Sequence, residues 1–410
     1  MTAVGVYVRI GGTDVRAGTL YVHRRRGVQS ASFSYDSAYL ADRRAYALDP
    51  ALPLAGGTYQ TGVGRAMFGA FTDCAPDRWG RTLVARREAA LAREEGRTRR
   101  TLTEVDYLLG VRDDLRQGAM RFRQGDDGPF LAEESTGVPA LTDLPELLRL
   151  AERAERDTAG LPDLHRLVRV GSSLGGTRPK VHVRLPDGRV AIAKFPSADH
   201  DTWNVMAWEK VALDLAEAAG IQVPDSELLH LAGRSVLVVN RFDRTPGGER
   251  LGYASAMTML DATDGEQRTY LDIADVIEQV STQATSELHQ LWRRLVFTIL
   301  ISNTDDHLRN HGFLHQRGDT WALAPAFDLN PNPAPGPTYL STAIDVGADE
   351  ASLDTALSVS ELFRLDDRQA HEVLDEVVHC VGTWRRVAAR HGLTPSEVAR
   401  MEPAFSAAAP

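Results

Sequence analysis

The most abrupt change in side-chain polarity along the chain lies at residue 301, where an apolar run is followed by a cluster of polar side chains. Residues 295–301 read LVFTILI, and residues 302–310 read SNTDDHLRN. Such an apolar run is typical of a buried helix, and acidic side chains at the end of a buried element are costly unless charged partners surround them. We therefore expect the fold to be built around this polar segment and to place a functional site there.

Composition limits the class of protein. The 410 residues are 43% hydrophobic, 25% charged and 7% aromatic, which excludes a disordered chain, a collagen-like fibre and a coiled coil, and predicts two or three globular domains. The net charge of −10 argues against direct binding of nucleic acid, because phosphate affinity depends mostly on Lys and Arg. Cys74 and Cys380 have no disulfide or zinc spacing. We expect a cytoplasmic protein without a signal peptide or membrane span.

The order of predicted elements indicates an α+β protein. Short strands alternate with turns up to about residue 70, a helical pattern follows to residue 109, and a polar segment at 124–141 reads as a linker. A helix is expected at 142–157, then a strand–loop–strand stretch from LVRV at 167–170 to AIAK at 191–194, with a hairpin turn at Pro186-Asp187-Gly188. Further on we expect a helix at 203–219, the strand SVLVVNRF, helices up to 301, and the strands GFLHQ and WALAPAFD.

Lysine is rare in this chain and marks a second candidate site. Only Lys180, Lys194 and Lys210 are lysine among 46 basic residues. Lys194 ends the apolar strand VAIAK, which is similar to the VAIK strand of protein kinases, and Glu209 on the next helix is a candidate partner. The Gly/Ser segment 171–176 offers backbone N–H groups to phosphates. The structural alternatives are an ordinary turn, a solvent-facing lysine and a surface glutamate.

Asp305 and Asn310 are five residues apart, which is the spacing between the base and the metal-binding Asn in the kinase loop HRDxxxxN. Asn303 occupies the place of the loop's His. Asp328 follows an apolar approach, as the Asp of the kinase DFG motif does, and together with Asn310 it would supply the oxygen ligands that Mg²⁺ prefers. The structural alternative is a set of capping and turn carboxylates.

In this order, several segments make the chain resemble the HipA family of toxin serine/threonine kinases over nearly its whole length. The segments are FTDCAPDRWGR, DYLLGVRDDLRQGAMR, SSLGGTRPK, AIAKFP, WEKVALDLAEAAGIQVP, VLVVNRFDR, NTDDHLRNHGFLH and APAFDLNP.

The resemblance implies residue roles. Asp305 corresponds to the catalytic base, Lys194 to the phosphate-pairing lysine, Asn310 and Asp328 to the Mg²⁺ ligands, and Ser173 to an autophosphorylated serine. The ATP-binding set that it implies comprises Gly175, Gly176, Thr177, Arg178, Pro179, Lys180, Lys194, Glu209, the hinge Asn240, Arg241 and Phe242, and His307, Asn310 and Asp328.

The expected architecture is a two-lobed, kinase-like fold with a β-rich N-terminal subdomain at 1–123, a linker at 124–141, a nucleotide-binding part at 142–244 and a helical lobe at 245–410. The resemblance further implies a toxin that phosphorylates a translation component such as an aminoacyl-tRNA synthetase and pairs with a helix-turn-helix antitoxin. Two alternatives are a small-molecule kinase of the aminoglycoside or choline type, and a protein that binds nucleotide without catalysis.

Overall fold

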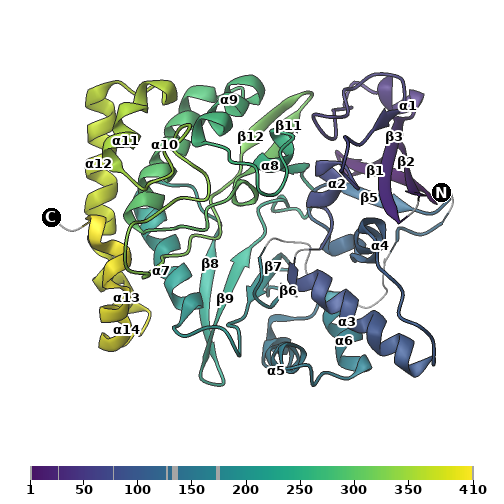
Figure 1. The fold of residues 1–410 in the computed structure, drawn as a ribbon, viewed down its shortest axis with the longest axis horizontal. Coiled ribbons are helices and arrows are strands. Elements are labelled where there is room, and N and C mark those ends of the chain that lie inside the picture. The colour runs from purple at the N-terminus through teal and green to yellow at the C-terminus, as the bar shows by residue number, and fades with distance from the viewer. Residues whose placement is uncertain are drawn as a thin grey trace. The chain divides into compact units, whose positions relative to one another are not determined.

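The computed structural model describes residues 2–25, 27–76, 78–125, 128–131, 137–171 and 176–408 (Figure 1). The chain forms two compact units, and each is assembled from three separate stretches of sequence. The first unit comprises Met1–His200, Asn240–Ala254 and Leu314–Asp319, and the second comprises Asp201–Val239, Ser255–Phe313 and Thr320–Pro410. The four consecutive segments expected from the sequence remain a prediction.

The first unit begins with an antiparallel five-stranded sheet in the order β4-β3-β2-β1-β5. The predicted strands are present, and the side chains of Val4, Val6, Leu20 and Phe33 are fully buried, although burial in β1 is continuous from Val4 to Val8 and does not alternate. A bulge between Val6 and Tyr7 shifts the register of the β1–β2 pair. The strands are β1 (Thr2–Ile10), β2 (Thr13–Arg25), β3 (Val28–Tyr35), β4 (Tyr59–Gln60) and β5 (Met120–Arg123).

Helices and one hairpin complete the first unit. Helix α3 packs on α6, which also contacts α5. The predicted turn at residues 186–188 is confirmed, because β6 pairs with β7 in antiparallel register around it. The elements are α1 (Ser37–Leu40), α2 (Gly69–Asp73), α3 (Arg78–Glu94), α4 (Glu104–Gly110), η1 (Asp113–Leu115), η2 (Leu141–Asp143), α5 (Leu144–Glu155), α6 (Leu161–Val170), β6 (Lys180–Arg184) and β7 (Val190–Lys194).

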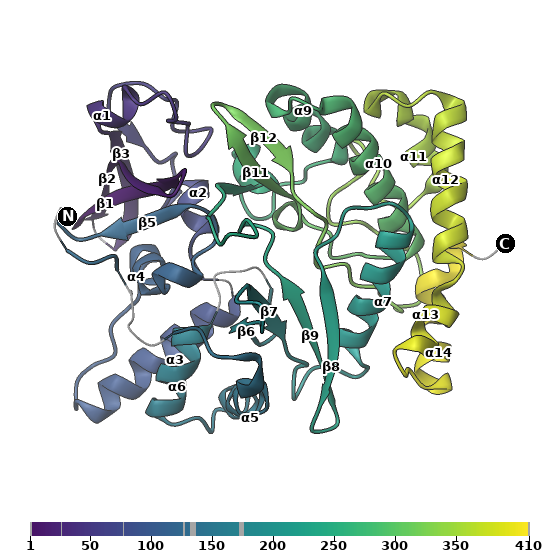
Figure 2. The ribbon, with the colours of Figure 1, turned by 180° about the vertical axis from the view of Figure 1, so that it is seen from behind.

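The second unit is mostly helical, and both ribbon views place its later helices next to one another (Figures 1 and 2). Helix α10 contacts α9 and α12, and α7 contacts α12 and α13. The elements are α7 (Val205–Ala218), β8 (Ser226–Leu231), β9 (Arg234–Asn240), α8 (Ala256–Met259), α9 (Tyr270–Val280), α10 (Ala284–Leu300), η3 (Leu308–Asn310), β12 (Thr320–Leu323), α11 (Leu353–Ser358), η4 (Ser360–Phe363), α12 (Asp367–Val381), α13 (Trp384–Arg390), α14 (Pro395–Met401) and η5 (Glu402–Ala408). Three strands contain points where the chain passes between the units: β9, whose last residue Asn240 belongs to the first unit, β10 (Tyr253–Ser255) and β11 (Gly312–Arg317).

Local sequence signals explain where several of these helices begin. Thr269, Asp366 and Thr394 each cap a helix through a reciprocal capping box, and the one at Thr394, which precedes Pro395, is the box that the sequence predicts. The apolar run at 295–301 forms the C-terminal part of α10 and its C-cap, and its side chains are 0–2% exposed. The buried helix ahead of the polar segment is therefore confirmed.

Three expectations at the level of elements are wrong. The strand expected over WALAPAFD ends at Leu323, and residues 324–328 are not in a strand. Residues 167–170 are not a strand: they form the last turn of α6, because Leu164, Leu167 and Val168 recur at helical spacing and pack inward. The stretch from 245 to 269 is not continuously helical either, since it contains the short strand β10, the four-residue helix α8 and loops. None of the helices that the structure describes has the length and apolar content needed to cross a membrane.

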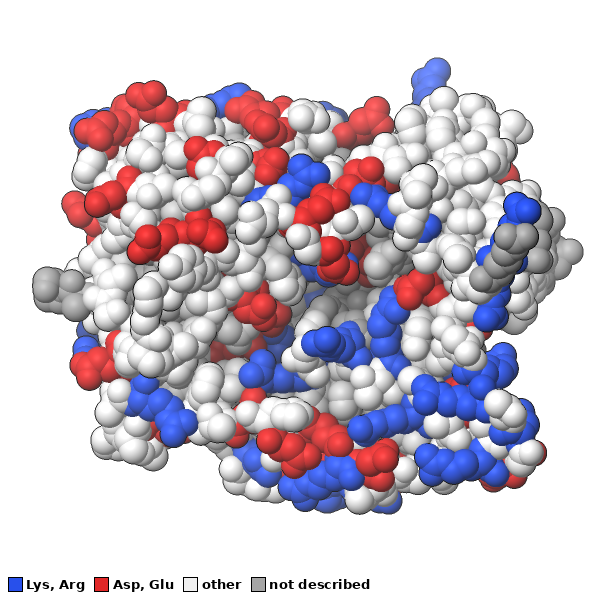
Figure 3. Space-filling view, in the orientation of Figure 1, with Lys and Arg blue, Asp and Glu red and all other residues white. Residues whose placement is uncertain are grey.

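Charge is distributed unequally between the two units. The first contains 34 Lys and Arg against 28 Asp and Glu, whereas the second contains 12 against 28. In Figure 3, acidic side chains gather over helices α9 to α12, and basic ones gather over α3, α5 and α6. The net charge of −10 therefore belongs to the second unit, and the first is weakly basic.

Candidate active site

The polar segment begins where helix α10 stops. The backbone N–H of Ser302 donates to Ile299 (3.1 Å), and that of Asn303 donates back to Thr298 (2.9 Å). Ser302 has a left-handed backbone with a φ of 52°, a conformation that L-residues adopt only at some cost. This turn ends the helix and directs the following residues away from its axis.

A tight turn joins the two residues that the kinase-like spacing singled out. The side-chain amide of Asn310 donates from Nδ2 to the carbonyl oxygen of Asp305 (3.0 Å), and the backbone N–H of His307 donates to the same oxygen (3.0 Å). Asn310 is 7% exposed and ends the short helix η3. The bond uses one of the two N–H donors of Nδ2 and leaves Oδ1 as an acceptor. The structure therefore places the side chain of Asn310 against the backbone of Asp305, and the catalytic roles of the two residues stay a prediction.

Asp306 is buried next to Asp305 and forms a cluster that the sequence did not reveal. Its carboxylate accepts a hydrogen bond from the hydroxyl of Tyr270 and contacts Nε2 of His311 at 3.1 Å. Burial alone would raise the pKa of Asp306, but the His311 and Tyr270 contacts outweigh it and lower that pKa below its usual value. Burial raises the pKa of Tyr270 far above 10, and the nearby Asp306 adds to this, so the phenol remains a donor. The doubled acid in TDDH was the only signal of this cluster.

Asp328 lies on the same unit, in the loop that follows β12. Its φ of 61° is left-handed, a backbone conformation that is uncommon for non-glycine residues but that Asp adopts more readily than most. Asn330 donates from its side chain to the carbonyl oxygen of Asp328 (3.0 Å), and Asn332 donates to Oγ1 of Thr304 (2.8 Å). These bonds link the loop after Asp328 to the segment that contains Asp305.

Asn303 is fully buried, and among the described residues neither Oδ1 nor Nδ2 of its amide has a hydrogen-bond partner. His307 has an unpartnered Nδ1 as well. Native proteins rarely leave buried polar atoms unsatisfied, and those they keep call for a specific explanation such as a functional role or an ordered water. These two residues flank Asp305 in sequence. The segment therefore holds buried polar atoms that do not take part in the hydrogen bonds of the described fold.

The first unit places two lysines directly opposite each other. Lys180 and Lys194 are Cα partners in the β6–β7 hairpin, so their side chains emerge on the same face of it. Lys180 is 3% exposed, and a Cβ added to Gly176 would lie 2.7 Å from its Nζ atom. Ammonium groups are chemically suited to phosphate oxygens, and the binding of ATP phosphates by these two lysines remains a prediction. Ser173 and Gly175 lie outside the described residues.

The predicted hinge residues lie at the end of β9, where Arg241 has a structural role. Its guanidinium, only 8% exposed, donates to the Asp243 carboxylate (2.6 and 2.8 Å) and to the carbonyl oxygens of Leu115 (2.7 Å) and Arg116 (3.0 Å). Asp243 also accepts from Arg244 (2.8 Å) and from the backbone N–H of Gly118 (2.8 Å). The side chain of Arg241 is thus committed to these partners, and only its backbone suits the role predicted for it.

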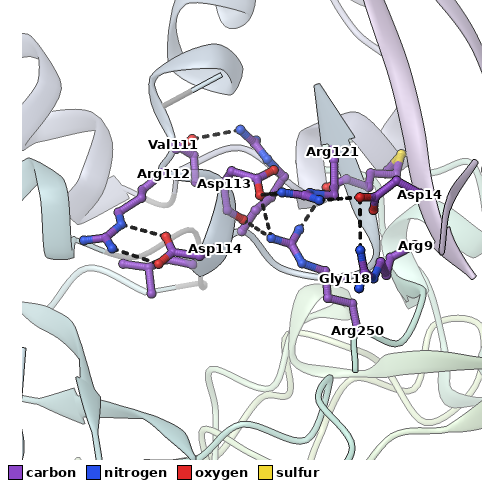
Figure 4. Close-up of polar contacts among 12 residues, drawn as sticks. Arg9, Asp14, Val111, Arg112, Asp113, Asp114, Gly118, Arg121 and Arg250 are labelled. Atoms are coloured by element: carbon purple, nitrogen blue, oxygen red, sulfur yellow. Dashed lines mark hydrogen bonds and ion pairs between the residues drawn. The ribbon is translucent and has the colours of Figure 1, made fainter. Parts of the chain in front are cut away.

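A second group of ion pairs continues this network within the first unit (Figure 4). The carboxylate of Asp113 accepts from Arg121 (2.6 and 2.9 Å) and from Arg250 (2.9 Å), while Arg121 also reaches Asp14 (2.7 Å), which pairs with Arg9 (3.0 Å). The segment that follows Arg241 is therefore bonded to the N-terminal sheet and to η1. Sequence reasoning missed this network because the bonds that join its parts, such as Arg121 to Asp14 and Arg250 to Asp113, link residues more than 100 positions apart.

The remaining candidates have different surroundings. Glu209 is 1% exposed on α7, and its ion pair with Lys194 stays a prediction. Lys210 pairs with Asp214 (2.6 Å) and with the hydroxyl of Ser226 (3.1 Å), which gives this third lysine a structural role.

Among the described residues no group of three His, Cys, Asp or Glu side chains could hold a metal. An amide oxygen and a carboxylate, as on Asn310 and Asp328, still fit Mg²⁺, which binds few protein ligands and keeps several waters.

Family models match both parts of the chain. The HipA N-terminal domain matches residues 8–100, and the HipA-like C-terminal domain matches residues 172–384, which is more than half of the sequence. The second match covers Lys194, Asp305, Asn310 and Asp328.

Individual proteins are also similar to this chain, with sequence identities of 30% and below. The chain is 30% identical over 152 residues to the Sinorhizobium fredii protein named "Putative kinase Y4dM" and 28% identical over 183 residues to a Haemophilus influenzae protein named "Putative kinase". These matches cover 34% and 39% of this chain and 36% and 52% of the two relatives. A chain in the structure of the Shewanella oneidensis toxin–antitoxin complex of HipA, HipB and operator DNA matches with a TM-score of 0.68 and 15% identity, covering 99% of this chain and 95% of that one. That match confirms the predicted fold class.

Proposed function

This chain belongs to the HipA family, and from that premise we propose that it is an Mg-ATP-dependent serine/threonine protein kinase that acts as the toxin of a toxin–antitoxin pair. The observation that carries the proposal is the turn in which the amide of Asn310 binds the carbonyl oxygen of Asp305. This bond holds Asn310 against the backbone of Asp305, so a residue with a carboxylate suited to proton acceptance lies next to one with an amide oxygen suited to a metal ion.

The chemistry assigned to the chain's own residues is limited, because phosphoryl transfer depends mostly on positioning and charge neutralisation. Asp305 accepts the proton of the substrate hydroxyl while that oxygen bonds to the γ-phosphorus and the bond from γ-phosphorus to the bridging β-phosphate oxygen breaks, which releases ADP. Lys194 and Lys180 neutralise phosphate oxygens. Asn310 and Asp328 would hold Mg²⁺, which supplies further charge neutralisation when bound.

We also propose a cytoplasmic setting, a DNA-binding antitoxin as partner and a translation component, such as an aminoacyl-tRNA synthetase, as target. The Shewanella oneidensis complex contains HipB and operator DNA in addition to HipA, which supports a partner of this kind. The net charge of −10 agrees with contact to DNA through such a partner rather than directly.

Phosphoryl transfer to protein is the direct test. Purified chain incubated with Mg-[γ-³²P]ATP and bacterial lysate should label protein, and Asp305→Asn should reduce the rate by about 10²-fold or more, since a positioned base contributes about 10²–10⁴. Preferential labelling of aminoglycosides or choline would favour a small-molecule kinase. Nucleotide binding without transfer, in the wild type and in Asp328→Ala alike, would favour a non-enzymatic regulator.

A further inference from the structure

Two adjacent hydroxyl residues, Ser341 and Thr342, contact the polar segment on either side of Asp305. The hydroxyl of Ser341 donates to the carbonyl oxygen of Thr304 (2.7 Å), and that of Thr342 donates to the carbonyl oxygen of Asp306 (2.7 Å). Thr304 and Asp306 are the two neighbours of Asp305 in the chain. The backbone is therefore held immediately before and immediately after the predicted base.

The segment that contains these hydroxyls is itself anchored in the second unit. The N–H of Ala343 donates to Arg268 (3.0 Å), and the carbonyl oxygen of Ala343 accepts from the N–H of Tyr270 (2.8 Å), as in a short parallel bridge. Leu340 donates to Asp349 (2.7 Å) on the other side of the two hydroxyls. Both flanks of the hydroxyl pair are thus fixed by backbone hydrogen bonds.

These bonds close into a ring through a single residue. Tyr270 binds Ala343 through its backbone N–H and binds the carboxylate of Asp306 through its phenol. Thr342, next to Ala343, binds the carbonyl oxygen of the same Asp306. Asp306 and Thr342 are 4% and 1% exposed, so most of the ring is shielded from water, where hydrogen bonds are harder to replace. Its closure restricts the backbone that leads out of Asp305.

We propose that Ser341 and Thr342 form a hydroxyl clamp that positions the carboxylate of Asp305 for proton acceptance. The inference rests on the proposed kinase function and adds positioning residues that lie more than 30 positions downstream of the base. A catalytic group must be held closely in place, since a displacement of about 1 Å can cost about 10²-fold in rate. The clamp residues do not touch the substrate, and they act through the backbone of Asp305.

The test compares conservative pairs at each position. Thr342→Val removes the donor at nearly constant shape, and Thr342→Ser retains it; Ser341→Ala and Ser341→Thr form the second pair. We expect Thr342→Val to lower kcat for labelling of the acceptor protein at least about 10-fold while KM for ATP changes less than about twofold, and Thr342→Ser to recover most of the rate. Thr383→Val is the matched control, because Thr383 donates to Cys380 (2.8 Å) in the same unit, away from Asp305.

Amide hydrogen exchange gives a readout that does not depend on activity. Peptides covering residues 302–308 should exchange faster in Thr342→Val than in wild type, and Thr342→Ser should restore slow exchange. Wild-type kcat in Thr342→Val, or an equal loss in Thr342→Ser, would overturn the clamp. If the wild-type chain labels no protein, the proposed function fails instead, and unchanged exchange in Thr342→Val would then remove the clamp as well.

Discussion

Asp328 has an uncommon backbone conformation and a proposed role as a metal ligand. Two substitutions can separate the effect on the backbone from the effect on metal binding. Asp328→Ala should abolish Mg²⁺-dependent transfer, because it removes a carboxylate ligand. Asp328→Asn is the control for folding, since Asn tolerates the left-handed conformation that Asp328 adopts at φ 61°. We expect both variants to be inactive and the Asn variant to unfold near the wild-type temperature. Activity in either one would remove Asp328 from the site.

Lys194 should not be replaceable by arginine. It lies opposite Lys180 on the hairpin, where a compact ammonium on a flexible stem fits and the planar guanidinium fork does not copy its geometry. We expect Lys194→Arg to lose transfer and to bind ATP more weakly, as measured by nucleotide titration. Lys210→Arg is the comparison, because Lys210 pairs with Asp214 away from the hairpin and should tolerate the change. Equal activity of the two variants would contradict the role of Lys194.

Ser173 is the predicted switch, although it lies outside the described residues. A phosphate there adds about −1.5 to −2 charge a few residues before Lys180 in the sequence, so we expect it to compete with the phosphates of ATP. We expect incubation with Mg-ATP to modify Ser173, as read by mass spectrometry, and the modified protein to bind ATP more weakly than Ser173→Ala does. Modification confined to Ser172, or unchanged affinity, would refute the switch.

Sequence patterns identified the candidate chemical groups of the site but not the residues that hold them in place. The spacing of Asp305 and Asn310 predicted a base and a metal ligand; both residues belong to one local turn, and their roles stay a prediction. Tyr270 and Thr342 could not be found in this way. Each is more than 30 residues from Asp306, and a hydroxyl that binds a distant carbonyl leaves no periodic signal in the sequence.

At the scale of elements, hairpins and capped helices were predictable because they depend on neighbouring residues. The β6–β7 turn and the Thr394 cap are examples. The stretch 167–170 was not, since four apolar and basic residues before a glycine fit a strand and a helix end equally well. Packing of α6 against α3 decides in favour of the helix.

The carboxylate of Asp243 joins separate elements of the first unit, because it binds Arg241, Arg244 and the N–H of Gly118. Burial opposes its ionisation, yet the two arginines outweigh burial and lower its pKa far below the usual value. Removing one partner of a buried charge network costs about 3–5 kcal/mol, so Asp243→Asn should lower the free energy of unfolding by roughly that amount. Denaturant titration at pH 7 measures it.

The lowered pKa of Asp243 also determines the sign of the pH dependence of stability. A carboxyl whose folded pKa is depressed contributes stability that is present above its unfolded pKa of about 4 and is lost as the pH falls toward the folded pKa. Wild type should therefore lose stability below about pH 4 more steeply than Asp243→Asn. Asp42→Asn serves as the control, because Asp42 pairs with Arg44 on an exposed turn and should change stability little. Parallel pH profiles of wild type and Asp243→Asn would contradict the assignment.

On the scale of the whole molecule, the first unit depends on a stretch that is distant in sequence. Residues 240–254 supply Arg241 and Arg250, which bind the carbonyl oxygen of Leu115 and the carboxylate of Asp113. A fragment of residues 1–200 should therefore fold poorly, because these buried partners would be left unsatisfied. Circular dichroism and amide exchange of the fragment, with and without a peptide of residues 240–254, test this. A fragment as stable as the intact chain would show that the network is dispensable.

The scarcity of lysine has a practical consequence for chemical labelling. Two of the three ε-amines in the chain face each other on one hairpin, and the third is engaged in an ion pair on α7. An acylating reagent delivered by an ATP-like head group would thus have few competing targets, and its adducts would map to two short peptides. Occupancy of the nucleotide site could then be followed in whole cells by mass spectrometry, without an antibody or a known substrate.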